Sequence, residues 1–333
     1  MKRLGIVLFL ILAVSSTFFL VKNFNPQETK SPIAKEKPLD KYTFQNLKKN
    51  NFSPSPIILG KSLNENINFI SQIFYYNVEG KKISGLLNVP VSEGLYPVIV
   101  MMRGFVPKEI YETGVGTKRA GEVFAQNGFI TIAPDFLGYG DSDNPSLDSI
   151  EERFQTYTTA LGLLSSIENL NNGLDASYSG KIKADTSRVG IWGHSNGGHI
   201  ALSILEVTGK NYPTVLWAPV SKPFPYSIFF FMDEFEDHGK ALRRVVANFE
   251  NDYNIELYSP SNFYSWINAP IEIHQGTADD AVPFKWSDLL VKDLTELEKD
   301  VTYFSYPGAD HNLLPGWDVA VQRSLEFYKE KLN

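Results

Sequence analysis

Residues 193–198 carry the pattern that most clearly implies chemistry, because the run Gly-His-Ser-Asn-Gly-Gly places Ser195 between two glycines. The apolar run Val-Gly-Ile-Trp at 189–192 precedes it, and this order predicts a strand, a sharp turn and then a helix. The glycines leave room where side chains would collide, so the turn exposes the serine hydroxyl. The backbone N–H of Asn196 then faces the point where an acyl oxygen would become negative. The pattern predicts a nucleophilic serine.

A serine hydroxyl needs a histidine to accept its proton and a carboxylate to orient that histidine. When the serine sits on such a turn, the order along the chain is serine, acid, histidine. Of the five histidines, only His311 lies beyond a suitable acid in the last part of the chain, in a glycine-bearing turn after the apolar run 301–306. The acid comes from the loop 276–283, where we favour Asp279 and assign helix capping to Asp280.

A negatively charged acyl oxygen needs a second backbone donor besides Asn196. The loop after Met102 can supply it, and the N–H of Phe105 is our choice because Gly104 lets the backbone approach a substrate. The spacing of His194 and His199 offers no third ligand for a metal, and no glycine-rich phosphate loop is present. The sequence therefore implies no metal and no cofactor.

Strand and helix patterns alternate along most of the chain, which predicts a doubly wound, mostly parallel α/β sheet with helices on both faces. Two apolar runs around Glu79-Gly80 predict an antiparallel hairpin at its N-terminal end. The aromatic-rich stretch 221–268 interrupts the alternation and is expected to be a cap inserted over the strand ends. The catalytic domain is expected to span 62–333, after a polar, proline-bearing tether at 22–61.

Lys2 and Arg3 precede an uncharged stretch from Leu4 to Val21. We favour an uncleaved membrane anchor at 1–21 with the catalytic domain outside the cytoplasm, because the stretch nearly reaches the length of a spanning helix. A cleaved signal peptide with its small-residue site at 13–15 is the alternative, and the protein would then be secreted. The net charge of −7 does not suggest a nucleic-acid-binding protein, and the absence of cysteine excludes disulfides and a cysteine nucleophile.

Three segments together resemble the catalytic domain of the prolyl oligopeptidase family, within the α/β-hydrolase superfamily: 193–198, the stretch 269–283 with its Gly-Thr-Ala-Asp-Asp-x-Val-Pro core, and 306–311. The resemblance runs from about Ile73 to the C-terminus. It implies an α/β-hydrolase fold with Ser195 as nucleophile, Asp279 as acid and His311 as base. Two departures are Arg103, where many members carry histidine or tyrosine, and Asn196, where the peptidases usually carry tyrosine.

The resemblance implies a serine hydrolase that cleaves a peptide or ester bond through an acyl-enzyme, with a short peptide or a small-molecule ester as substrate. The family favours a peptidase. Asn196 and the absence of the large N-terminal β-propeller of the well-known peptidases favour a carboxylesterase acting on small esters. A non-catalytic binding protein of the α/β-hydrolase fold is the alternative of another class, although such proteins normally lose a triad residue and none is lost here.

Overall fold

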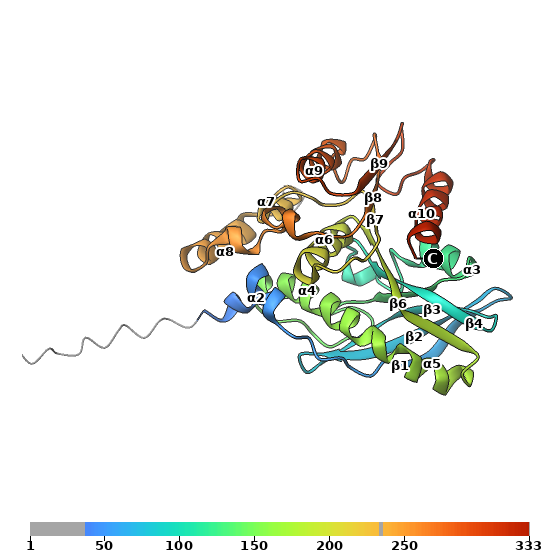
Figure 1. Ribbon diagram of the computed structural model, residues 1–333. Helices are drawn as coiled ribbons and strands as arrows, with labels where there is room; N and C mark the ends of the chain where they lie inside the picture. The colour runs from blue at the N-terminus through green and yellow to red at the C-terminus, as the bar shows by residue number, and fades with distance from the viewer. Residues whose placement is uncertain (1–36, 233–235, 333) are drawn as a thin grey trace, which may run out of the picture. The chain divides into compact units, whose positions relative to one another are not determined.

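A mixed sheet forms the centre of the computed structural model, which describes residues 37–232 and 236–332 (Figure 1). In these residues the sheet has nine strands, in the spatial order β1-β2-β3-β5-β4-β6-β7-β8-β9. Their bounds are β1 (Ile58–Glu65), β2 (Phe69–Val78), β3 (Lys81–Pro90), β4 (Gly94–Met102), β5 (Ile130–Pro134), β6 (Ile182–His194), β7 (Thr214–Trp217), β8 (Ile271–Gly276) and β9 (Val301–Tyr306).

The described helices precede, connect or follow these strands along the chain. The α-helices are α2 (Phe44–Lys49), α3 (Lys118–Gln126), α4 (Ser149–Ser166), α5 (Leu170–Tyr178), α6 (Asn196–Thr208), α7 (Tyr226–Phe229), α8 (Lys240–Asp252), α9 (Phe284–Glu296) and α10 (Trp317–Lys331). The short 3₁₀ helices are η1 (Pro38–Tyr42), η2 (Lys108–Ile110), η3 (Ile167–Asn169), η5 (Ile255–Tyr258), η6 (Pro260–Asn262) and η7 (Tyr264–Trp266).

Strands β4 to β9 pair in parallel, whereas β1, β2 and β3 join the sheet in antiparallel register. Strands β2 and β3 are connected through the turn Glu79-Gly80. Every residue of β5, β7 and β8 is buried, as in strands covered by helices on both faces. Helices α3 and α10 lie on one face, and α4 and α6 lie on the other (Figure 1). This is the doubly wound arrangement that the alternation predicts.

The order of the parallel strands places the loops that follow β4 and β6 side by side. Strand β4 lies between β5 and β6. After β4 the chain forms β5 on one side of it, and then crosses over to form β6 on the other side. Crossover helices then diverge to opposite faces at the carboxyl ends of β4 and β6, which leaves a crevice where ligands bind in open α/β sheets. Arg103 follows β4 and Ser195 follows β6 at this point.

The segment from Leu39 to Lys61 corrects the predicted tether. The structure places it in the same compact unit as the sheet, and it forms η1, α2 and the beginning of β1. The side chains of Tyr42, Phe44 and Leu47 are buried, and Phe44 stacks on Phe263 with ring centroids 4.8 Å apart. Burial of each such side chain contributes about 2 kcal/mol, which outweighs the polar and proline-rich composition. The predicted domain start at residue 62 is therefore wrong, and the packed unit begins near Leu39.

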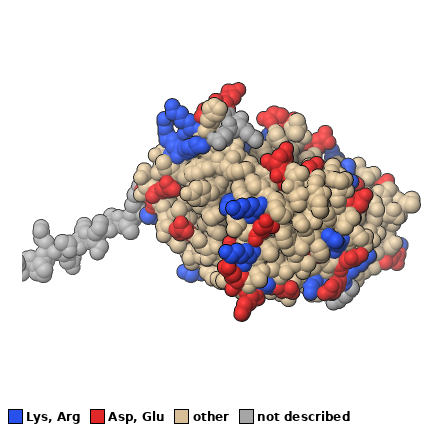
Figure 2. All heavy atoms as spheres, turned by 90° about the horizontal axis from the view of Figure 1, so that it is seen from above, with Lys and Arg blue, Asp and Glu red and all other residues tan. Residues whose placement is uncertain are grey.

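The predicted anchor at 1–21 and the first part of the tether lie outside the described residues. Within 37–232 and 236–332, no helix combines the length and the apolar character needed to cross a membrane. On the face shown in Figure 2, basic and acidic side chains are interspersed over an otherwise uncharged surface. That face carries no continuous basic stripe.

Candidate active site

Ser195 occupies a strained turn between β6 and α6. Its backbone has φ 58° and ψ −122°, a conformation that residues with a side chain rarely adopt and that is often retained at functional sites. Gly193 and Gly197 make the turn possible. A Cβ on Gly193 would lie 2.6 Å from the carbonyl oxygen of Gly197, and a Cβ on Gly197 would collide with the carbonyl oxygen of Met102.

Hydrogen bonds from both sides hold the strained residue. The Ser195 N–H donates to the carbonyl oxygen of Trp217, at the end of β7, over 2.9 Å. Its carbonyl oxygen accepts from the N–H of Gly198 at 2.9 Å and from that of Val220 at 3.0 Å. The backbone of Ser195 is thus fixed to the ends of two neighbouring parallel strands.

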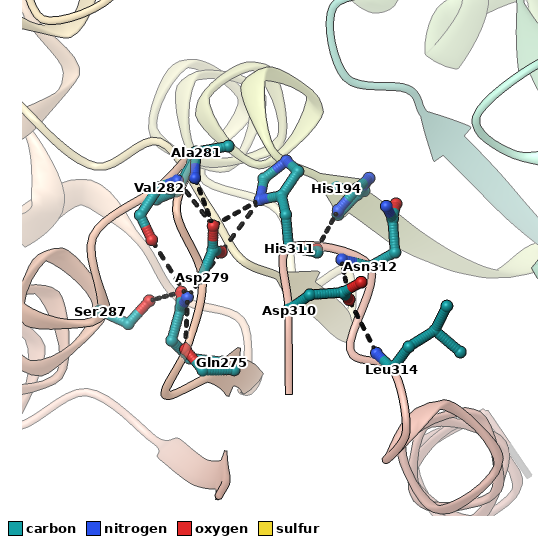
Figure 3. Close-up of polar contacts among 11 residues, drawn as sticks. His194, Gln275, Asp279, Ala281, Val282, Ser287, Asp310, His311, Asn312 and Leu314 are labelled. Carbon is teal, nitrogen blue, oxygen red and sulfur yellow. Dashed lines mark hydrogen bonds and ion pairs between the residues drawn. The ribbon is translucent and has the colours of Figure 1, made fainter. Parts of the chain in front are cut away.

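Asp279 and His311 meet above the ends of the next two strands. The loop after β8 carries Asp279, the loop after β9 carries His311, and β8 and β9 are paired in parallel. His311 Nδ1 lies 2.9 Å from Asp279 Oδ2 and 3.1 Å from Oδ1 (Figure 3). Nε2 points away from the carboxylate and remains available for proton transfer. Asp280 is exposed to solvent.

The Asp279 carboxylate is completely buried and accepts several further hydrogen bonds. Oδ1 accepts from the N–H of Ala281 at 3.0 Å and of Val282 at 2.8 Å, and Oδ2 accepts from Gln275 Nε2 at 2.8 Å. Burial alone would raise the pKa of Asp279, but the hydrogen bond to His311 and those from Val282 and Gln275 hold the pKa below its ordinary value. Asp279 therefore stays ionised and can orient the imidazole.

The loop after β4 approaches the serine closely. A Cβ placed on Gly104 would lie 2.9 Å from Ser195 Cβ and 3.4 Å from its Oγ, so only glycine leaves this space to a substrate. In the described structure the backbone N–H groups of Phe105 and Asn196 have no intramolecular acceptor. His311 and Ser195 likewise form no direct hydrogen bond in these residues. Catalytic hydrogen bonds in unliganded enzymes are often completed only when substrate binds.

Arg103, which in the sequence is only a departure from the family pattern, has defined contacts in this loop. Its buried guanidinium donates to the carbonyl oxygen of Gly104 at 2.9 Å and to that of Asp135 at 2.8 Å. It also lies over the rings of Tyr139 and Tyr111, 4.0 and 4.6 Å from their centroids. Arg103 therefore fixes the orientation of the Gly104 peptide next to Ser195.

His194 supports the histidine loop. Its Nε2 lies 2.9 Å from the carbonyl oxygen of His311, and the two rings are 4.7 Å apart (Figure 3). Burial, followed by the adjacent His311, lowers the pKa of His194 to about 4. The neutral ring therefore donates its Nε2–H to this carbonyl. Its position directly before the nucleophile is the only sequence signal that could have indicated this contact.

A cavity of about 360 Å³ opens beside the serine turn. Gly104, Phe105 and Asn196 line one part of it, and Arg153 and Tyr157 from α4 line another. His199, from α6, is buried in this wall and pairs with the Tyr157 hydroxyl at 2.8 Å. Ile228 and Leu242, from the segment between β7 and β8, also line the cavity.

The other ionisable groups in the described part of the chain do not form a metal centre. Within residues 37–232 and 236–332, no group of three or more histidine, cysteine, aspartate or glutamate side chains could hold a metal ion. His274, buried in β8, instead bonds to the Tyr306 hydroxyl at 2.7 Å and to Glu272 at 2.8 Å. These contacts explain His274 as part of the core.

The sequence and the structure both resemble those of peptidases and esterases. The sequence model described as the prolyl oligopeptidase family matches residues 118–333, which is more than half of the chain. A protein of Bacillus subtilis described as the uncharacterized peptidase YtmA is 26% identical over 255 residues, covering 75% of this chain and 89% of that protein.

Two solved structures show the same fold. Acetyl xylan esterase 1 from a Thermoanaerobacterium species has a TM-score of 0.56 and 18% identity, covering 87% of this chain and 93% of its own. The acylaminoacyl peptidase of Pyrococcus horikoshii has a TM-score of 0.58 and 21% identity, and the match covers 80% of this chain and 42% of that peptidase. Both likenesses support the α/β-hydrolase fold.

Proposed function

The chain belongs to the prolyl oligopeptidase family of serine hydrolases, and we propose that it cleaves an ester or peptide bond through Ser195, Asp279 and His311. The observation that carries this proposal is the pairing of His311 with the buried carboxylate of Asp279, beside a serine held in a strained turn. Each residue follows a different parallel strand, so the sheet positions all three.

In the proposed reaction, His311 Nε2 accepts the hydroxyl proton as Ser195 Oγ attacks the carbonyl carbon. Asp279 stabilises the resulting imidazolium through Nδ1. The carbonyl oxygen becomes negative and accepts hydrogen bonds from the N–H groups of Asn196 and Phe105. His311 then protonates the leaving group, which departs and leaves an acyl group on Ser195. His311 then deprotonates a water molecule as its oxygen attacks the acyl carbon, and returns that proton to Ser195 Oγ as the acid leaves.

The same groups can cleave an ester or an amide. The amide requires His311 to protonate a poor leaving group before the tetrahedral intermediate collapses back. A small-ester carboxylesterase is the second candidate, favoured by the limited volume of the cavity beside Asn196. We propose that the segment 221–268 acts as a cap over this cavity, supported by Ile228 and Leu242 in its wall.

Turnover of matched substrates tests the proposal. The protein would be assayed with p-nitrophenyl esters and with aminoacyl p-nitroanilides that carry the same acyl groups. Comparable kcat/KM values for an ester and its anilide would identify a peptidase. Hydrolysis of the esters alone would identify an esterase, and hydrolysis of neither would contradict the proposed activity.

We further propose that residues 1–21 anchor the protein in a membrane with the catalytic unit outside the cytoplasm. The support is the uncharged stretch from Leu4 to Val21 after Lys2 and Arg3. Cleavage near residue 15 would instead give a secreted enzyme with the same active site.

A further inference from the structure

Arg153 places a positive charge in the wall of the cavity beside Asn196, the residue that follows Ser195. It lies in the first turns of α4, whereas Gly104, Phe105 and Asn196 line the same cavity from the loop after β4 and from the serine turn. A substrate whose carbonyl oxygen faces Phe105 and Asn196 would therefore extend part of its structure toward Arg153.

The guanidinium of Arg153 is poorly compensated. Nε is buried and has no hydrogen-bond partner, and Nη2 makes only a long contact of 3.4 Å with the Ser227 hydroxyl. No ion pair involves Arg153 in the described part of the chain. Glu152, the acidic residue lining this cavity, pairs with Lys108 instead, at 3.5 Å near the solvent.

The charge of Arg153 acts on a neighbouring side chain in the cavity wall. Burial, followed by the charge of Arg153, lowers the pKa of His199 to about 3, so His199 is neutral. The Tyr157 hydroxyl pairs with His199 Nε2, and burial raises the pKa of Tyr157, so its neutral hydroxyl does not neutralise Arg153. A partly buried charge without an ion-pair partner is costly to the folded protein, and arginine is suited to binding carboxylates through two parallel hydrogen bonds.

The side of the substrate that reaches Arg153 follows from the position of His311. His311 must approach the leaving group to protonate it, and it lies on the loop after β9, outside the described lining of this cavity, as does Ser195. Phe105 and Asn196, which would hold the carbonyl oxygen, do line it. The group that enters this cavity is therefore attached to the carbonyl carbon on the acyl side of the cleaved bond.

We propose that Arg153 binds a carboxylate on the acyl portion of the substrate, so that the enzyme selects esters or amides of dicarboxylic acids or of acyl groups with an acidic side chain. This proposal rests on the proposed hydrolase function. Two parallel hydrogen bonds from the guanidinium would hold the carboxylate while the acyl carbonyl faces Phe105 and Asn196. The same contact would position the carbonyl carbon for attack by Ser195.

A pair of esters that differ only at the end of the acyl chain tests the selectivity. The p-nitrophenyl monoester of glutaric acid ends in a carboxylate where p-nitrophenyl valerate ends in a methyl group. We expect the wild-type protein to prefer the glutaric ester in kcat/KM. Arg153→Met should lower the ratio of the two kcat/KM values on the order of 100-fold, the value of one charge-assisted contact. Arg153→Lys, which keeps the charge but not the planar fork, should lower the ratio less.

Arg244→Met is the matched control, because Arg244 is an exposed arginine of α8, outside this cavity wall. This variant should leave the ratio unchanged. Equal wild-type kcat/KM values for both esters, or a ratio that Arg153→Met leaves unchanged, would overturn the proposal. A thermal melt of each variant identifies any loss of folding. If Arg153→Met does not fold, the selectivity ratio of Arg153→Lys is compared with that of the wild type instead.

A binding measurement separates this proposal from the proposed catalysis. Glutarate would be titrated into Ser195→Ala and into the double variant Ser195→Ala/Arg153→Met, and calorimetry would measure the heat of binding. Binding that is lost in the double variant supports the carboxylate site even if neither ester is hydrolysed, in which case only the hydrolase function fails. Failure of glutarate to bind, or equal binding by both variants, contradicts the carboxylate site.

Discussion

His311 Nδ1 lies 2.9 Å from Oδ2 of Asp279, a carboxylate that is completely removed from solvent. This contact fixes which ring nitrogen of His311 carries a proton in the resting protein, because an ionised carboxylate can only accept a hydrogen bond. In the neutral ring this leaves the lone pair on Nε2, which is the arrangement required to accept a proton from Ser195.

Asp279→Asn should retain the fold and lose activity. The amide can donate to Nδ1, so it favours the tautomer with the proton on Nε2, and kcat should fall about 10⁴-fold. The matched control is Asp280→Asn, at an exposed neighbouring position, which should cost far less. Steady-state hydrolysis of a p-nitrophenyl ester measures both losses. A larger loss in the Asp280 variant would show that the wrong neighbour had been assigned.

Arg103→Met should lower kcat more than it raises KM. The guanidinium holds the Gly104 peptide, and loss of this contact should displace the Phe105 N–H from the developing oxyanion, which matters in the transition state. We expect a decrease in kcat on the order of 10- to 100-fold. Arg119→Met is the control, because Arg119 is exposed and lies over Trp317. An unchanged kcat in the Arg103 variant would show that the guanidinium does not orient the loop.

Stability should fall as the pH decreases below about 6.5, partly because of His194. The unfolded chain binds a proton at this histidine near pH 6.5, whereas the folded protein binds it only near a pKa of about 4. More protons are bound by the unfolded state in this window, so acid favours unfolding. At pH 5 the free energy of unfolding should be roughly 2 kcal/mol lower than at neutral pH because of this histidine.

Urea unfolding at neutral pH and near pH 5 measures this contribution. His194→Gln keeps a side-chain donor for the His311 carbonyl oxygen but cannot titrate, so its free energy of unfolding should depend less steeply on pH. His199, whose pKa is about 3, contributes in the same direction in both proteins. The prediction fails if wild type and variant lose the same free energy between the two pH values.

The full-length protein should fractionate with membranes and resist extraction by alkaline carbonate. A shortened form that begins at Lys37, just before the packed unit, should remain soluble and active, because the sheet and its helices follow that point. A soluble mature form that begins near Ser16 would show a cleaved signal peptide instead. The active-site assignment does not depend on which of these is found.

Much of the fold could be predicted from local sequence signals. Buried runs such as 98–102 have the character of central strands, and the glycines around Ser195 specify a turn that few other sequences adopt. The segment 39–49 could not be assigned in this way. Its few apolar side chains are stabilised by distant partners such as Phe154 and Phe263, which the sequence does not place beside them.

The contact between Asp279 and His311 could be anticipated, because the order of strands brings their two loops together. The supporting contacts could not. Arg103 acts through carbonyl groups and aromatic rings from separate loops, and His194 acts through a backbone oxygen of the His311 loop. Whether an acidic side chain pairs with Arg153 depends on how the chain packs. The lack of a partner for its Nε is therefore visible only in the folded structure.

Labelling with a fluorophosphonate probe shows directly whether Ser195 is the nucleophile. Such a probe reacts with an activated serine, and digestion followed by mass spectrometry identifies the modified residue. We expect a single adduct on Ser195. Ser195→Ala should be unlabelled, keep its melting temperature and lose about 10⁴-fold or more in kcat. Labelling of another residue, or undiminished labelling and turnover in Ser195→Ala, would contradict the claim that Ser195 is the nucleophile.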